Sequence, residues 1–279
     1  MKKIASVLSF LLILALLSGC GGEKLGQSQP TTEPQTTLSR TVKVTFPEGF
    51  TAVQIAKRLE ENDVCPAADF IAQVQSPDDF YEDFPFLAEI NNPDERPFLL
   101  EGFIFPDTYE FYRGENARSV LKRFLKNTAS KLTDEYALRA EQLGYTLDQI
   151  LALASIVQKE AGMKEQMGKV SSVLHNRLES PEYGKLQCDV TINYINDYVT
   201  DSEYLTDTKT DFAALYNTYK CNGLPAGAIC NPGLDAIEAA LYPEKTDYFF
   251  FVTDQDNNYY YASTYREHQE NCRKCGING

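Results

Sequence analysis

The sequence has no tryptophan, no visible internal repeat, no cluster of lysine and arginine, and no glycine-rich phosphate loop. The lack of a repeat argues against solenoid and propeller folds, in which one unit recurs at a fixed spacing. Acidic residues outnumber basic ones, 40 to 26, which gives a formal net charge of −14. We therefore expect that such an acidic chain, lacking a basic patch, does not bind nucleic acid or anionic lipid through its bulk surface.

An apolar run at residues 4–17 follows Lys2 and Lys3 and is too short for a comfortable membrane span. A charged start followed by such a run is typical of a secretory signal, which we expect over residues 1–19. The run ends in LSGC at residues 17–20, a pattern similar to a bacterial lipobox, in which Cys20 is lipidated through its thiol and becomes the mature N-terminus. The alternative is a plain cleaved signal with an incidental cysteine.

Residues 20–39 are rich in small and polar residues and in proline, so we expect a flexible linker after Cys20. Two or more acyl chains on Cys20 would give stable anchoring. These features predict a lipid-anchored protein on the extracytoplasmic face of the cell membrane, working close to the membrane surface.

The other six cysteines form an even number, which permits disulfides in an exported protein without fixing their pairing. They are Cys65, Cys188, Cys221, Cys230, Cys272 and Cys275. His268, Cys272 and Cys275 could supply three zinc ligands, but no fourth stands nearby, so we expect no metal site.

Patterns along the chain predict an α+β fold. Alternating apolar residues at 42–46 are typical of a strand, residues 108–112 suggest another, and two helical segments begin near Thr51 and Pro66. This order predicts a small βααβ module over residues 40–113, similar to LysM-type glycan binders. The alternative is that the module only packs against the rest of the chain.

Residues 114–279 are predicted to form a second, mixed domain in which helices dominate. A long helical stretch is expected from about 116 to 143, and two further helices follow around Glu160 and Leu174. A short helix is expected at 234–241. Aromatic runs at 248–253 and 259–263 then flank the turn residues DQDNN and predict a β-hairpin near the C-terminus.

Glu160 ends a helical pattern that begins with a capping box, Thr146 followed by Gln149. It projects from the same apolar face as Ile150, Leu153, Ile156 and Val157. A carboxylate on an apolar face loses solvation, which raises its pKa and keeps the acid protonated near neutral pH. Such a group can act as a general acid. The alternative is a helix-end glutamate whose stem packs while its head reaches water.

Five separated blocks of sequence resemble a known family. They are LLEGFIFPDTY at 99–109; ASIVQKEA at 154–161; VLHNRL at 173–178 with LQCDVT at 186–191; YNTY at 216–219 with GLPAGAI at 223–229 and NPG at 231–233; and YFFFVT at 248–253 with Glu267 and His268. In collinear order over about residues 40–271, these blocks are similar to the endolytic murein transglycosylases of the YceG-like (MltG) family.

The resemblance implies a lyase that cleaves peptidoglycan within its glycan strands, at the β-1,4 bond from N-acetylmuramic acid to N-acetylglucosamine. The product ends in 1,6-anhydro-N-acetylmuramic acid. Glu160 would protonate the leaving oxygen and then, as a carboxylate, accept the proton of the attacking C6 hydroxyl. No metal or organic cofactor is implied. The expected partners are peptidoglycan strands and the membrane, with peptidoglycan synthases as candidate protein partners.

Four further residues in these blocks carry polar groups suited to N-acetyl and hydroxyl contacts, namely Gln187, Asp189, Tyr216 and Asn217. Each could instead satisfy buried backbone groups around tight turns. Two departures from the family pattern bear on the site. Cys188 stands where the family has threonine, and Gln158 stands where the family often has an acid, which leaves Glu160 as the only carboxylate of its block.

Two other functions stay open. A glycoside hydrolase would need a second carboxylate, such as Asp189 or Glu267, about 5–10 Å from Glu160, and would produce a reducing end. Glu267 has a helix-start role as its alternative. A non-catalytic peptidoglycan-binding lipoprotein would leave the strands intact and tolerate Glu160→Gln.

Overall fold

The computed structural model describes residues 39–205 and 209–277. The predicted signal peptide, Cys20 and almost all of the predicted linker lie outside the described residues. The described residues, from Ser39 onward, belong to one compact unit. Among the described residues, no helix combines the length and the apolar character that crossing a membrane requires.

The first elements have the predicted βααβ order. Strand β1 (Thr41–Thr45) pairs antiparallel with β2 (Thr108–Tyr112), and helices α1 (Ala52–Glu61) and α2 (Ala67–Gln75) lie between them in sequence. Thr51 starts α1 through a capping box with Gln54. Three short 3-10 turns, at Asp78–Phe80, Pro85–Glu89 and Pro93–Glu95, occupy the segment before β2.

An aromatic cluster joins this βααβ segment to the next helix, α3 (Ala117–Lys131). Phe46, Tyr109 and Phe111 each pack against Phe124 of α3, with ring centroids 5.1, 4.4 and 5.8 Å away. The side chains of the βααβ segment and of α3 therefore share one core.

The long helical stretch predicted from 116 to 143 is wrong in one respect, because it is two helices. The chain leaves helical geometry at Leu132, and α4 (Asp134–Gln142) begins after Thr133. The Thr133 side chain caps α4 by accepting a hydrogen bond from the Tyr136 amide. A threonine at this position favours a new helix start over continuation.

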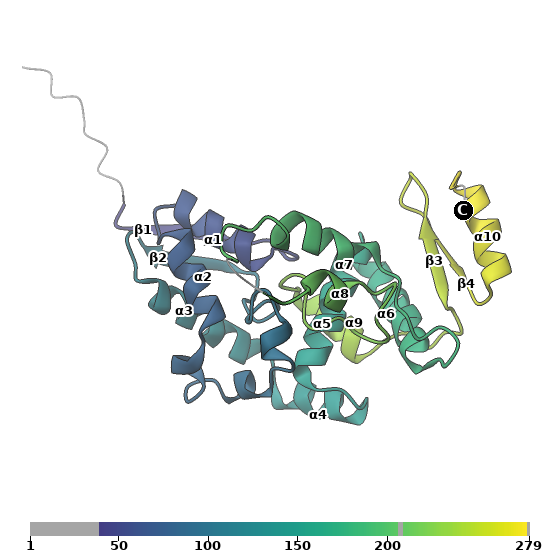
Figure 1. The fold of residues 1–279 in the computed structure, drawn as a ribbon, viewed down its shortest axis with the longest axis horizontal. Helices are drawn as coiled ribbons and strands as arrows, with labels where there is room; N and C mark the ends of the chain where they lie inside the picture. Colours follow the sequence, from purple (N-terminus) through teal and green to yellow (C-terminus); the bar gives the residue numbers. More distant parts are fainter. Residues whose placement is uncertain (1–38, 206–208, 278–279) are drawn as a thin grey trace, which may run out of the picture. The chain divides into compact units, whose positions relative to one another are not determined.

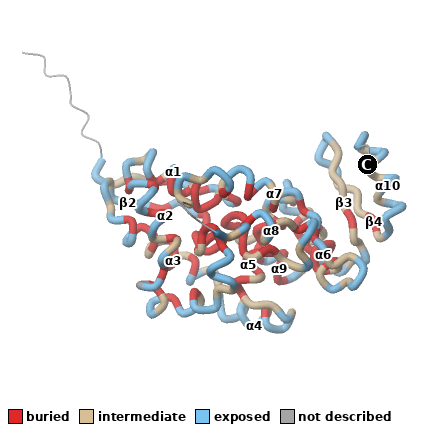
Figure 2. Tube along the Cα trace, in the orientation of Figure 1, coloured by how far each residue is buried: buried red, intermediate tan, exposed pale blue. Residues whose placement is uncertain are grey.

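Helix α5 (Leu147–Glu160) is buried along nearly its whole length and packs against α4, α6 (Lys164–Glu179) and α9 (Leu234–Leu241). Figure 2 shows this concentration of buried residues around α5 and α9. Between α6 and α9 lie α7 (Asp189–Tyr194), a π-helical turn (Ile195–Val199) and α8 (Phe212–Tyr216). A helix that is apolar on all sides belongs at the centre of a core.

The C-terminal β-hairpin is confirmed. Strands β3 (Phe250–Thr253) and β4 (Tyr259–Ala262) pair antiparallel. Helix α10 (Tyr265–Lys274), which the sequence suggested only through the alternative helix-start role of Glu267, packs on both strands (Figure 1). The structure is thus mixed and rich in helices, with two small antiparallel sheets among the described residues, which confirms the α+β class.

Candidate active site

Glu160 lines a cavity of about 380 Å³ together with Gln187 and Asp189. The three side chains come from the end of α5, the loop before α7, and the first residue of α7. The remaining lining is mixed, with Arg177 of α6 and aromatic residues of β3 and α10. Its volume lies in the range of about 300–1,000 Å³ that is usual for small-ligand sites.

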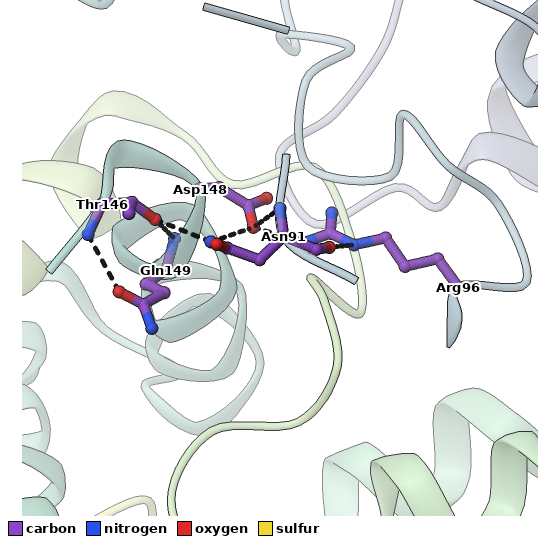
Figure 3. Close-up of polar contacts among 5 residues, drawn as sticks. All are labelled: Asn91, Arg96, Thr146, Asp148 and Gln149. Atoms are coloured by element: carbon purple, nitrogen blue, oxygen red, sulfur yellow. Dashed lines mark hydrogen bonds and ion pairs between the residues drawn. The ribbon is translucent and has the colours of Figure 1, made fainter. Parts of the chain in front are cut away.

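The beginning of α5 is held by a buried polar cluster, which Figure 3 shows. Thr146 and Gln149 form the predicted capping box. The carboxylate of Asp148 makes a buried ion pair with Arg96 and accepts hydrogen bonds from the backbone and side-chain nitrogens of Asn91, at 3.1 and 3.0 Å. These contacts fix the position from which the helix runs toward Glu160.

The end of α5 is held by the hairpin. The Tyr259 hydroxyl of β4 donates a hydrogen bond to the carbonyl oxygen of Glu160 at 3.1 Å and accepts one from the Gly162 amide at 2.8 Å. A helix end leaves carbonyl groups without partners inside the helix. Tyr259 satisfies one of them and so anchors the backbone of Glu160.

The Glu160 carboxyl is half-buried on the cavity wall. Burial raises its pKa to about 7, the negative charge of Asp189 adds to the rise, and a hydrogen bond from the Cys188 thiol holds it back. Glu160 is therefore present partly as the neutral acid near neutral pH, as a general acid requires.

Gln187 is held by Arg177, a buried residue of α6. The Arg177 guanidinium donates hydrogen bonds to the side-chain oxygen of Gln187 and to the carbonyl oxygens of Lys185 and Phe249. Arginine only donates, so it engages the oxygen of the Gln187 amide and leaves the amino group for other partners. The backbone of Gln187 is left-handed, with φ of 56°, a strained conformation of the kind found at functional sites.

Thr218 fixes the backbone on either side of this strained residue. Its carbonyl oxygen accepts from the Gln187 amide at 3.0 Å, and its hydroxyl accepts from the Cys188 amide at 2.9 Å. Thr218 is fully buried. The YNTY block at 216–219 thus supports the LQCDVT block at 186–191. No local sequence pattern indicates this contact, because the two segments are distant in sequence.

Asp189 is exposed at the start of α7 and accepts a hydrogen bond from the Tyr219 hydroxyl at 2.7 Å. Burial raises the pKa of Tyr219 to about 12, and the bond to Asp189 adds to this rise. Tyr219 is therefore a donor at every physiological pH. Among the residues that line the cavity, Glu160 and Asp189 are the carboxylates.

The structure places Tyr216 and Asn217 outside the lining of this cavity. Tyr216 is only 1% exposed and packs on Tyr194, with ring centroids 5.5 Å apart. Asn217 accepts a hydrogen bond from the Tyr219 amide through its side-chain oxygen at 3.0 Å. Their contact with a substrate stays a prediction.

Glu267 and His268 have different roles. Glu267 closes a capping box with Thr264 at the start of α10, which is the helix-start role considered as its alternative. His268 lines the cavity and stacks on Phe250, with ring centroids 5.1 Å apart. Burial and the nearby Arg177 lower the pKa of His268, so the ring is neutral at neutral pH.

Glu101 is a buried carboxyl that the sequence analysis did not single out. It is 1% exposed, accepts hydrogen bonds from the Ala52 amide and from the side chains of Asn231 and Tyr194, and does not line the Glu160 cavity. Burial raises its pKa to about 8, against the opposing effect of these donors. The sequence signal that could have pointed to Glu101 was its position in the LLEGFIFPDTY block at 99–109.

Within the described ranges, no group of three or more histidine, cysteine, aspartate or glutamate side chains is arranged to hold a metal ion. His268 and Cys272 do approach each other on α10, with Nε2 and Sγ 3.6 Å apart. The six cysteines of the described part are free thiols.

The fold and the site together define a helix-rich α+β protein in which a carboxyl with a raised pKa, at the end of one helix, lines a cavity with polar and aromatic walls. The model of the YceG-like family matches residues 24–274, and the chain belongs to this family.

Named relatives and a solved structure are similar to this chain and carry names that fit the family. The chain is 29% identical over 239 residues to an endolytic murein transglycosylase of Bacillus subtilis (82% of this chain), and 29% identical over 262 residues to one of Streptococcus pneumoniae (88% of this chain). It spans 63% and 46% of the lengths of these relatives. A crystal structure described as a yceG-like protein from Listeria monocytogenes superposes with a TM-score of 0.69 at 30% identity, covering 82% of this chain and 75% of the other.

Proposed function

We propose that this protein is a lytic transglycosylase that cleaves peptidoglycan within its glycan strands. The observation that carries the proposal is the Glu160 carboxyl, which lines a cavity and has its pKa raised to about 7. Membership of the YceG-like family and the names of the relatives support it. The bond broken would be the β-1,4 link from N-acetylmuramic acid to N-acetylglucosamine.

In this mechanism Glu160 acts twice. The neutral acid donates its proton to the glycosidic oxygen, which leaves with the N-acetylglucosamine residue. The C6 hydroxyl of the same N-acetylmuramic acid attacks its own C1, and the Glu160 carboxylate accepts the hydroxyl proton. No water is consumed, the product end is a 1,6-anhydro sugar, and Glu160 is again protonated. An intramolecular nucleophile has a high effective concentration, so one carboxyl suffices.

Gln187 and Asp189 would contact the substrate. The amino group of Gln187 is free to donate because Arg177 occupies its oxygen, which suits an N-acetyl carbonyl or a sugar hydroxyl. The carboxylate of Asp189 raises the pKa of Glu160 and has an oxygen available for sugar hydroxyls. Tyr216 and Asn217 stay candidates for substrate contact, and the bond from the Tyr219 amide to Asn217 also supports the turn that carries Tyr219.

The surrounding assignments belong to the same proposal. Cys20 would anchor the protein in the cell membrane on its extracytoplasmic face, residues 40–113 would position the glycan as a LysM-like module, and residues 114–279 would form the catalytic domain. Peptidoglycan synthases are the candidate protein partners. The relatives are named endolytic murein transglycosylases, which supports an enzyme of the cell envelope.

Mass spectrometry of digested glycan tests the activity. Wild-type protein should release strands ending in 1,6-anhydro-N-acetylmuramic acid. Glu160→Gln should keep the fold, because the shapes match, while turnover falls by at least ~10²-fold. Glu165→Gln, which removes an exposed carboxyl of α6 outside the cavity, is the matched control. Full activity in Glu160→Gln would exclude the proposed role.

A hydrolase is the second candidate, because Asp189 is a second carboxylate in the same cavity. The same spectra separate the two: reducing ends that incorporate oxygen from labelled water indicate hydrolysis, and anhydro ends indicate the lyase. Intact strands after incubation would instead indicate a binding protein.

A further inference from the structure

Two exposed tyrosines line the Glu160 cavity. Among the described residues, the large hydrophobic side chains that remain exposed are Tyr112, Leu138, Met163, Tyr219, Tyr242, Tyr265 and Ile277. Of these, Tyr219 and Tyr265 belong to the cavity wall. Aromatic surface left open to water at a polar cavity is the kind of surface that a ligand covers.

Tyr265 belongs to the first turn of α10 and is 58% exposed. Its ring centroid lies 5.9 Å from that of Phe250 and 6.3 Å from that of His268, and these two rings stack on each other. Phe250 is itself buried. The ring of Tyr265 therefore has a packed aromatic support and still presents open surface to the cavity.

Tyr219 reaches the cavity from a different segment, the turn after α8, and is 42% exposed. Its hydroxyl is fixed by Asp189 at 2.7 Å, and its backbone amide is fixed by the side chain of Asn217 at 3.0 Å. A ring held at both ends loses little conformational entropy when a ligand covers it.

We propose that Tyr219 and Tyr265 bind the glycan by stacking on its sugar rings, at two places on the wall around Glu160. This inference rests on the proposed function and adds the residues that select the sugar. A pyranose with equatorial substituents presents C–H bonds on its broad faces, and the negative face of an aromatic ring attracts these weakly positive groups. The two rings would therefore accept β-1,4-linked N-acetylglucosamine and N-acetylmuramic acid, and an axial hydroxyl on the stacked face would disturb the contact.

Stacking of this kind acts on the bound sugar and on the transition state alike, so it should appear in KM more than in kcat. With soluble, uncrosslinked glycan strands as substrate, Tyr265→Ala should raise KM by about three- to tenfold, with kcat within about twofold of wild type. Tyr265→Phe should restore most of the lost affinity, because it keeps the ring. The matched control is Tyr242→Ala, an exposed tyrosine (47%) outside the cavity, which should leave both constants unchanged.

Tyr219 tests the second place on the wall. Tyr219→Phe keeps the ring and loses the hydroxyl bond to Asp189, whereas Tyr219→Ala loses both. The inference expects KM to rise clearly more in the alanine variant than in the phenylalanine variant. Equal effects would mean that the hydroxyl alone matters and would overturn the stacking role of this residue.

A direct binding measurement uses the absence of tryptophan from the chain. In the Glu160→Gln background, Tyr265→Trp introduces a single tryptophan that can still stack and reports on its surroundings by fluorescence. Addition of the same glycan strands should change its emission with saturation. Tyr242→Trp in the same background is the control and should give no change.

The outcomes separate this inference from the proposed function. Anhydro products from the wild type, together with unchanged KM in Tyr265→Ala and no response of the tryptophan introduced at this position, would overturn the stacking inference while the lyase stands. A saturable response without any cleavage by the wild type would support stacking and overturn the lyase.

Discussion

At the scale of single residues, the proton affinity of Glu160 is set by neighbours that act in opposite directions. Burial and the charge of Asp189 raise its pKa to about 7, and the Cys188 thiol lowers it. In the proposed mechanism the reactive form is the protonated acid, so kcat/KM should fall as the pH rises above about 7. We therefore expect Glu160 to set the alkaline limb of the profile of kcat/KM against pH.

Two substitutions should move that limb in opposite directions. Asp189→Asn removes the negative charge, lowers the pKa of Glu160 and shifts the decline in kcat/KM to lower pH. Cys188→Ala removes the hydrogen bond to the carboxylate, raises the pKa and shifts the decline to higher pH. Profiles of kcat/KM against pH measure both shifts. If the decline in kcat/KM moved in the same direction in the two variants, Glu160 would not be the group that titrates in this limb.

The raised pKa of Glu101 predicts how the free energy of unfolding changes with pH. Its pKa in the folded protein, about 8, lies above its ordinary value of 4.5. The stability that this group contributes is therefore fully present below about pH 4.5 and is lost as the pH rises toward 8. Glu101→Gln does not titrate, so its free energy of unfolding should decline less over this range. Chemical denaturation at a series of pH values measures the two slopes, and identical slopes would show that Glu101 does not titrate with folding.

At the scale of elements, the contact between β4 and the end of α5 should matter for catalysis. Tyr259→Phe removes the hydroxyl that bonds the Glu160 carbonyl and the Gly162 amide, while keeping the ring. We expect a loss of about 1 kcal/mol in stability and a fall in kcat of about tenfold from the displaced carboxyl.

The matched control for this change is Tyr260→Phe in the same strand. The Tyr260 hydroxyl bonds Asp254 within the hairpin and does not reach α5. This variant should keep the wild-type kcat. Thermal unfolding and initial rates of both variants give the comparison, and a kcat for Tyr259→Phe equal to that of the control would rule out the positioning effect.

Short sequence patterns predicted the helices and strands that depend on neighbouring residues alone. The capping box of Thr146 gave the start of α5, and alternation in the aromatic runs gave the hairpin. The break at Leu132 was missed because Thr133 is an N-cap inside a continuous helical pattern. Helix α10 was missed because none of its residues is buried, although Thr264 and Glu267 carried a capping signal.

The residues of the candidate site could be predicted from the sequence only where the side chain itself indicates a function. Glu160 stood out as a carboxylate on an apolar helix face, Gln187 and Asp189 as polar groups in a motif block, and the structure places all three in one cavity. The roles of Arg177 and Thr218 depend on bonds to segments that are distant in sequence or lie on other elements, so periodicity gave no signal for them. The same holds for Glu101, whose partner Asn231 lies far along the chain.

At the scale of the whole molecule, the lipobox prediction concerns residues outside the described structure. Cys20→Ser should block lipidation and leave the protein soluble or as an unprocessed precursor, because a thioether to lipid cannot form at serine. Membrane fractionation and intact mass of the wild type and this variant measure the effect. A serine variant that is processed and partitions into membranes like the wild type would make the prediction wrong.

The hairpin and α10 form one wall of the cavity, and Tyr259 of the hairpin bonds the end of α5. They are the last described elements of the chain. A polypeptide emerging from its export channel N-terminus first would deliver Glu160 well before Tyr259, Tyr265 and His268. Until those late residues arrive, the carboxyl would face an open, unfinished surface. The cavity would thus lack this wall until the residues of the hairpin and α10 had emerged and folded.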